Sequence, residues 1–211
     1  MSNEGILFNK YLGELIEWNK KFNLTSITDP AEIRKKHFAD SLLLLEHRQL
    51  SAETVVDVGA GAGFPGLPLK LACPGIKLTL LEATKKKVGF LDHLIKTLGL
   101  TETGAVWARA EDFAAAHRES FDLAVARAVA DLRVLAELCL PLVRVGGQFV
   151  AWKEVDIAAE LAAAGPAIAQ LGGRLREVKT HPQRSLVFLD KIGPTPAAFP
   201  RRTGLAKKRP L

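Results

Sequence analysis

Short apolar segments alternate with longer amphipathic segments over most of the chain. Between the short segments, apolar residues recur every three or four positions, as at Val88, Leu91 and Leu98, which predicts amphipathic helices. Strands that alternate with helices predict a parallel, doubly wound α/β sheet whose strands are covered on both faces. The expected strands are residues 54–58, 77–82, 104–108, 121–126 and 147–152.

The pattern changes on both sides of this region. An Ala-rich helix is expected over residues 157–171, and two further strands follow, separated by a break at Pro182. We interpret these strands as an antiparallel hairpin at the edge of a seven-stranded, mostly parallel sheet. The first 50 residues predict two helices, the second beginning at Asp29-Pro30, an N-cap followed by proline at the first helical position. The expected parts are a helical N-terminal extension (residues 1–50), an α/β domain (51–190) and a C-terminal tail (191–211).

Charge is concentrated in the C-terminal tail. The chain has 211 residues and a net charge of +6, and the tail alone contains six basic residues and no acidic one. Such a tail on a nearly neutral body predicts a polyanionic partner, most simply nucleic acid, although a tail kept basic for solubility has the same composition. Its proline and glycine spacing predicts an extended strip rather than a helix. The basic residues are Lys191, Arg201, Arg202, Lys207, Lys208 and Arg209.

Cysteine content and hydropathy exclude several classes of protein. Cys73 and Cys139 are far apart and have no metal-ligand spacing, so neither a metal site nor a disulfide framework is expected. The residues after Met1 have neither the basic nor the apolar region of a signal peptide, and no apolar run reaches about 18 residues. We therefore expect a soluble, cytoplasmic protein without membrane contact.

Glycines gather directly after the first expected strand, in the stretch TVVDVGAGAGFPGLP (residues 54–68). Such a cluster predicts a sharp turn or close approach of a ligand to the backbone. A Walker-type phosphate loop is excluded, because Leu67 follows Gly66 where a lysine is needed. A dinucleotide-binding fingerprint, G-x-G-x-x-G, is satisfied by Gly61, Gly63 and Gly66 and stays open.

Two details favour S-adenosylmethionine as the ligand of this loop. Asp57 precedes Gly59 in a D-x-G-x-G-x-G arrangement, where a carboxylate can neutralise the positive charges of this cofactor. Pro65 removes a backbone N–H from the turn that would otherwise grip a pyrophosphate. Glu82 ends the second strand, where an acidic residue accepts hydrogen bonds from ribose hydroxyls in either cofactor. An NAD(P)- or nucleotide-dependent oxidoreductase remains the alternative at this point.

Longer stretches resemble one family. NLTSITDP, KHFADSLLLL, VVDVGAGAGFPGLPL, RAED, FDLAVARAVADL, LPLVRVGGQFVAWK and PRRTGLAKKRPL occur in this order from about Leu24 to Leu211. Together they are similar to the RsmG (GidB) family of 16S rRNA guanine-N7 methyltransferases. The resemblance implies a class I, Rossmann-like S-adenosylmethionine-dependent methyltransferase fold that methylates N7 of guanine 527. It also implies 16S rRNA or the small ribosomal subunit as partner, and we expect a monomer without an obligate protein partner.

The motifs and the resemblance together select the candidate site residues. Arg127 is the candidate catalytic residue, and no metal ligand is expected. Where the family pattern often has a small residue before the arginine and a Lys-Gly pair after the fifth strand, this chain has Ala126 and Lys153-Glu154. The missing glycine leaves the role of Lys153 open. The candidate cofactor-binding residues are Asp57, Gly59, Gly61, Gly63, Phe64, Glu82, Ala110, Glu111 and Arg127, and the candidate RNA-binding residues are Arg201, Arg202, Lys207, Lys208 and Arg209.

Guanine N7 carries a lone pair at neutral pH, so its methylation requires alignment of the reactants rather than a nucleophile or a general base. We interpret both cysteines, Cys73 and Cys139, as core residues rather than as catalytic nucleophiles.

His37, Asp40 and Ser41 share one helix face, which argues against a hydrolytic triad. Their role is packing or capping, or forming a wall of the site. For Arg127, the alternative to a site role is an ion pair with Asp122 or Asp131.

Overall fold

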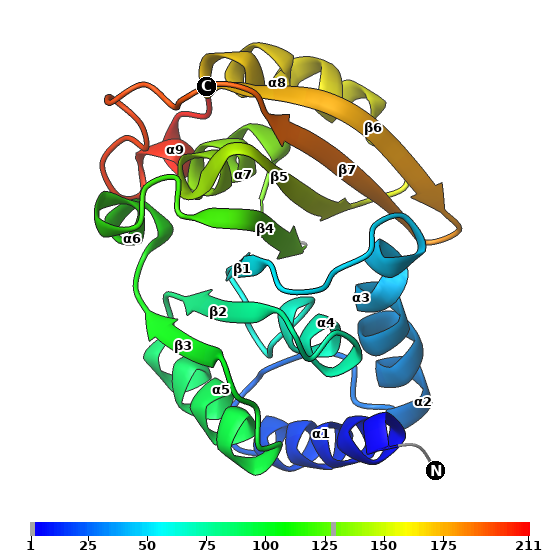
Figure 1. The fold of residues 1–211 in the computed structure, drawn as a ribbon. Coiled ribbons are helices and arrows are strands. Elements are labelled where there is room, and N and C mark those ends of the chain that lie inside the picture. Colours follow the sequence, from blue (N-terminus) through cyan, green and yellow to red (C-terminus); the bar gives the residue numbers. More distant parts are fainter. Residues whose placement is uncertain (1–2, 128–129) are drawn as a thin grey trace.

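The structure is a computed structural model that describes residues 3–127 and 130–211. Its seven strands form one sheet in the order β3-β2-β1-β4-β5-β7-β6 (Figure 1). Strands β1 to β5 are parallel, while β7 runs antiparallel to both β5 and β6. The predicted fold class, including the edge hairpin, is therefore confirmed. The strands are β1 Thr54–Val58, β2 Lys77–Glu82, β3 Thr103–Trp107, β4 Phe121–Arg127, β5 Val143–Lys153, β6 Gly173–His181 and β7 Arg184–Lys191.

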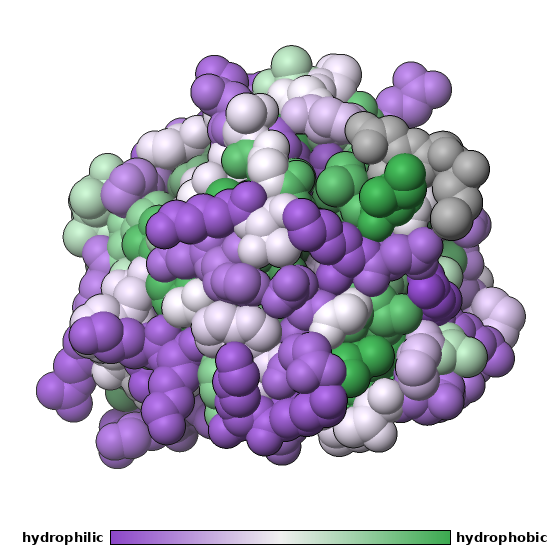
Figure 2. Space-filling view, turned by 90° about the horizontal axis from the view of Figure 1, so that it is seen from below, coloured by the Kyte–Doolittle hydropathy of each residue, from purple (hydrophilic) through white to green (hydrophobic). Residues whose placement is uncertain are grey.

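Helices cover both faces of the sheet. One buried cluster joins α1, α4 and α5 to the first face, and a second joins α6, α7 and α8 to the opposite face (Figure 1). The outer side of the α1 layer, seen from below in Figure 2, is mostly hydrophilic, as expected for a solvated helix surface. The helices are α1 Asn3–Asn19, α2 Pro30–Ile33, α3 Asp40–Leu42, α4 Gly66–Ala72, α5 Lys85–Thr97, α6 Ala110–Ala116, α7 Leu132–Cys139, α8 Ala158–Gln170 and α9 Leu205–Lys208, with a 3-10 turn at Leu140–Leu142.

The N-terminal extension contains the two expected helical segments, but the second is irregular. Asp29 caps it by accepting the Glu32 N–H at 2.9 Å. After α2 the chain widens into a π-helical segment at Arg34–Ala39, continues through α3 and ends in a 3-10 turn at Leu43–Glu46. π-Helical turns are rare and recur at functional sites. This one carries His37 and leads directly into Asp40.

One strand is longer than the sequence pattern predicts. β5 was expected to begin at Gly147, but it starts at Val143 and passes through Gly146 and Gly147 with a register shift against β4. A Cβ at Gly147 would lie 2.7 Å from the Asp122 carbonyl oxygen, so glycine permits a close approach of the two strands here. The glycines thus mark an irregularity inside the strand rather than its beginning.

The C-terminal tail folds back over α6 and α7 (Figure 1). The prediction of an extended strip without helix is wrong, because α9 forms where Leu205 and Ala206 pack inward. Lys191, counted with the tail charges, ends β7 and is 1% exposed. Its ammonium group lies 3.0 Å from a Glu119 carboxylate oxygen and donates to the Leu140 carbonyl oxygen at 2.7 Å. No helix in the part of the chain that the structure describes has the length and apolar composition needed to cross a membrane.

Candidate functional site

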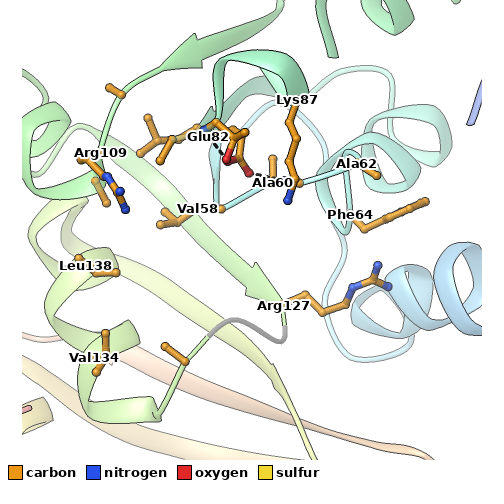
Figure 3. Close-up of a pocket in the computed structure, with 18 of the residues that line it drawn as sticks. Val58, Ala60, Ala62, Phe64, Glu82, Lys87, Arg109, Arg127, Val134 and Leu138 are labelled. Carbon is orange, nitrogen blue, oxygen red and sulfur yellow. Dashed lines mark hydrogen bonds between the residues drawn. The ribbon is translucent and has the colours of Figure 1, made fainter. Parts of the chain in front are cut away.

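A cavity of about 540 Å³ lies at the carboxyl ends of the central parallel strands. This is the edge at which open α/β sheets bind their ligands. In Figure 3, Glu82 and Lys87 lie on one side of the cavity and Val134 and Leu138 on the other. Of the candidate site residues, those that line it are Gly59, Gly61, Phe64, Glu82, Ala110, Glu111, Arg127 and Lys207.

The loop after β1 contains backbone conformations that only glycine adopts easily. Gly59, Gly61 and Gly63 have φ angles of 77°, 61° and 100°. Gly59 and Gly61 lie in the cavity lining. Gly63, also predicted to bind the cofactor, is not part of the cavity lining. A Cβ at Gly63 would lie 2.6 Å from the Tyr11 hydroxyl oxygen on α1. Its small size therefore serves packing against α1.

Asp57 lies beneath the glycine loop rather than in the cavity lining. It is fully buried, and its Oδ2 accepts the Gly66 N–H at 2.8 Å. Its Oδ1 is buried without a hydrogen-bond partner among the described residues. Burial raises the pKa of Asp57 to about 7. Asp57 was predicted to contact the cofactor, but it does not line the cavity. Its hydrogen bond to Gly66 instead holds the loop onto β1.

Glu82 is a buried carboxylate that faces the glycine loop. It ends β2 and is 6% exposed. Its Oε2 accepts the Gly61 N–H at 3.0 Å, and its Oε1 accepts the Thr84 N–H at 2.7 Å. Each carboxylate oxygen can accept two hydrogen bonds, so one position on each remains for a ligand. Glu82 is in this way both oriented and able to accept further donors.

The turn after β3 forms the next wall. Arg109 precedes α6 and lines the cavity together with Ala110 and Glu111, the two residues that the resemblance selects here. The Glu111 side chain accepts the Gly204 N–H at 2.8 Å, so this wall is attached to the C-terminal tail. Arg109 was not predicted, although its place directly before Ala110 in the RAED motif could have indicated it.

Arg127 is held at the cavity by the N-terminal extension. Its side chain is 9% exposed, its Nη1 lies 3.0 Å from Asp40 Oδ2, and its guanidinium carbon lies 4.8 Å from the centre of the Phe64 ring. Asp40 Oδ1 in turn lies 3.1 Å from Arg184 Nε, so one buried carboxylate joins two arginines.

The alternative for Arg127, an ion pair with Asp122 or Asp131 in place of a site role, is not what the structure shows. Asp122 pairs with Arg144, and Asp131 pairs with Arg133. Residues 128–129, which continue the FDLAVARAVADL motif beyond Arg127, lie outside the described residues.

His37 forms a wall of the same end of the cavity. Its ring stacks on Phe64 at 4.6 Å, and burial together with the nearby Arg127 charge lowers its pKa to about 4. The ring is therefore neutral at pH 7. Arginine can only donate, so His37 Nδ1 accepts from Arg127 Nη2 at 3.2 Å. The ring proton is then on Nε2, 2.8 Å from Thr25 Oγ1.

Ser41 and Lys153 have structural contacts. The Ser41 hydroxyl donates to the His37 carbonyl oxygen at 2.6 Å rather than to its imidazole, so these residues do not form a triad. Lys153 lies 2.6 Å from a Glu160 carboxylate oxygen and donates to the Ala130 carbonyl oxygen. Lys153 thereby ties β5 to α8 and to the segment before α7.

The C-terminal tail completes the cavity, which sequence reasoning missed. Gly204, Ala206 and Lys207 line it. Arg201, predicted to contact RNA, is instead paired with the completely buried Glu137, with Nε–Oε1 at 2.8 Å and Nη2–Oε2 at 2.5 Å. The other four candidate RNA-binding residues are exposed: Arg202, Lys207, Lys208 and Arg209.

The sheet order and the site at its carboxyl edge define a class I S-adenosylmethionine-dependent methyltransferase. In agreement, the solved structure of M. jannaschii TYW2 in complex with AdoMet matches with a TM-score of 0.62, covering 81% of each chain at 13% identity. At that identity the likeness concerns the fold alone.

Sequence comparison identifies the family. Residues 6–187 match the family model of GidB, rRNA small subunit methyltransferase G. Curated relatives named ribosomal RNA small subunit methyltransferase G are 44% identical in Brevibacillus brevis, covering 97% of this chain and 90% of the relative, and 48% identical in Pelotomaculum thermopropionicum, covering 97% and 89%. The chain belongs to the GidB family, which confirms the resemblance and removes the oxidoreductase alternative.

Proposed function

We propose that the protein transfers the methyl group of S-adenosylmethionine to N7 of a guanine in 16S rRNA. The observation that carries this proposal is the buried Glu82 carboxylate, which faces the glycine loop in a cavity at the carboxyl edge of the sheet. Family membership supplies the substrate class, because the relatives are named for methylation of small-subunit rRNA.

The residues of the cavity fit this cofactor. Glu82 would accept hydrogen bonds from the ribose hydroxyls through its remaining lone pairs. Gly59, with its φ of 77° and no side chain, would leave the backbone open to the amino-acid part. Val134 and Leu138 line the opposite wall and would contact apolar parts of the adenosine. When bound, S-adenosylmethionine supplies an electrophilic methyl group.

The chemistry of guanine N7 matches a site without an activated nucleophile. N7 attacks with its own lone pair and carries no proton, so no general base is required. Arg127 would orient the base or a phosphate by donating to an oxygen such as guanine O6. The rigid contacts of Arg127 with Asp40, His37 and Phe64 preorganise this donor, and orientation of the reactants supplies much of the rate.

The neutral state of His37 suits the charge that develops. Methylation at N7 leaves a positive charge on the guanine, and a second cation beside Arg127 would oppose it. Because Arg127 donates to His37 Nδ1, the imidazole is kept in one tautomer without a charge. His37 is thus a positioning residue for Arg127.

The exposed cations of the tail would bind the RNA backbone. Lys207 lies in the cavity lining, and Arg202, Lys208 and Arg209 are exposed nearby in the same short segment. Phosphate contacts of this kind fix the position of an RNA without selecting its sequence. Arg201 is excluded from this group because Glu137 engages its guanidinium.

Two measurements test the proposal. Calorimetric titration with S-adenosylmethionine and with NADH shows which cofactor binds, and we expect heat only with the first. Transfer of methyl label to unmodified 16S rRNA, offered naked or in assembled small subunits, tests the substrate. Binding of NADH alone, or label on neither RNA form, would contradict the proposal.

A further inference from the structure

A cluster of metal-binding side chains lies at the far end of the N-terminal extension. Glu46 ends the 3-10 turn, His47 follows it, and His181 ends β6 at the tip of the edge hairpin. One ligand atom from each of the three residues lies within 4.8 Å of the others. None of them lines the described cavity. The two histidines are 134 positions apart in sequence, so no spacing motif indicates the cluster.

The two imidazoles face each other through nitrogen atoms. His47 Nε2 lies 3.0 Å from His181 Nε2, and their ring centres are 5.1 Å apart. A Glu46 carboxylate oxygen lies 3.9 Å from His181 Nδ1. Without a metal, one Nε2 must keep its proton and donate it to the other. A metal ion would replace that shared proton by two coordinate bonds.

The geometry is close to that of a metal site. Zinc–nitrogen bonds of about 2.0–2.1 Å at a tetrahedral centre place two nitrogen ligands about 3.3 Å apart. The observed Nε2–Nε2 distance of 3.0 Å needs only a small opening of the two rings. The Glu46 side chain is 60% exposed and can rotate to supply the third ligand. Two imidazoles and one carboxylate form a donor set that zinc prefers over magnesium or calcium.

We propose that Glu46, His47 and His181 bind a divalent transition-metal ion of the zinc type, with water completing the coordination. The ion joins the end of the N-terminal extension to the tip of the β6–β7 hairpin. Since unfolding separates these segments, the bound ion stabilises the folded chain.

The position of the site links it to the cavity through short contacts. Arg184 follows His181 by three residues and pairs with Asp40, which also pairs with Arg127. The proposed ion therefore braces the same two segments that hold Arg127. None of the three metal-binding residues lines the cavity, so zinc binding and methyl transfer are measured independently. The metal proposal can fail while the proposed function stands, and the reverse is also true.

The test uses the full chain after treatment with a chelator, titrated calorimetrically with zinc chloride and with magnesium chloride. We expect one zinc ion per chain with a dissociation constant in the micromolar range or below, and no heat from magnesium. His47→Gln and His181→Gln should each weaken zinc binding at least tenfold. His93→Gln is the matched control, because His93 pairs with Glu14 at 2.7 Å and has no second imidazole among its described contacts. This variant should bind zinc as the parent chain does.

Two further readouts keep the result interpretable. Each variant is first melted without metal, and only variants within a few degrees of the parent chain are compared. Zinc should then raise the melting temperature of the parent chain and of His93→Gln but not of His181→Gln. Zinc binding that persists in the His47→Gln, His181→Gln double variant, or the absence of binding below millimolar zinc, would overturn the proposal.

Discussion

Removing the guanidinium of Arg201 tests whether the C-terminal tail is part of the cofactor cavity. In the folded chain, Glu137 is completely buried on α7 and both of its oxygens accept from Arg201. Two residues further on, Thr203 donates to Asp112, and Gly204 then reaches the cavity. Arg201→Ala leaves the buried carboxylate without its charged partner and releases the anchor of this segment.

The magnitude follows from the burial of Glu137. Leaving one member of a buried ion pair without its partner costs about 3–5 kcal/mol. For a chain of this size, 1 kcal/mol shifts the melting temperature by about 2–4 °C, so a fall of roughly 6–20 °C is expected. If the tail detaches and Glu137 regains water, the fall is smaller, but the cavity loses the wall made by Gly204, Ala206 and Lys207.

The assay is a thermal melt combined with calorimetric titration of S-adenosylmethionine. We expect Arg201→Ala to lower the melting temperature and to weaken cofactor binding by about tenfold or more, which corresponds to at least about 1.4 kcal/mol. Arg202→Ala removes an exposed neighbouring charge and should change neither quantity. Replacing both Glu137 and Arg201 by leucine should restore much of the stability, because an apolar pair needs no charge partner.

An Arg201→Ala variant with an unchanged melting temperature and an unchanged cofactor dissociation constant would refute this reasoning. The tail would then lie against the body without supporting the cavity.

Four other expectations follow from the described contacts. Glu82→Ala should weaken S-adenosylmethionine binding by about 1–3 kcal/mol, since it removes a charged acceptor, and an unchanged affinity in calorimetry would remove Glu82 from the site. Gly59→Val should abolish cofactor binding because its φ of 77° strains a β-branched residue, and tight binding by a folded variant would contradict this. Asp57 keeps a proton in the folded chain up to a pKa of about 7, against 3.8 when unperturbed, so its contribution to stability declines as pH rises from about 4 to 7. Asp57→Asn should remove that decline in denaturant titrations, and an equal pH dependence of both proteins would argue against it. Replacing Lys207 and Lys208 by alanine should reduce the slope of log affinity against log salt for 16S rRNA by about 1–2, whereas an equal slope would exclude phosphate contacts.

The central strands and the cofactor motif could be predicted because their signals are local. β1 and β2 have the expected boundaries, since each apolar run is bounded by polar or glycine residues. Gly59 and Glu82 follow strands directly, and a parallel sheet brings the ends of its strands to one edge. Their place in the cavity therefore required only the strand pattern and the right topology.

The contacts of Arg127 and the tail could not be predicted, because they join distant segments. Asp40 lies 87 positions before Arg127, while the nearer carboxylates of Asp122 and Asp131 have their own arginine partners. The basic composition of the tail likewise does not distinguish a cation that faces solvent from Arg201, whose partner on α7 is 64 positions away. Such pairings depend on packing rather than on spacing in the sequence.

The central claim is methyl transfer to guanine N7, and the most direct test identifies the methylated atom. Unmodified 16S rRNA is incubated with the protein and S-adenosylmethionine, digested to nucleosides and analysed by mass spectrometry, with strand cleavage at N7-methylguanosine to locate the position. The account predicts one 7-methylguanosine per RNA with the parent chain and a strongly reduced yield with Glu82→Ala. Methylation at another atom, or an equal yield from both proteins, would contradict it.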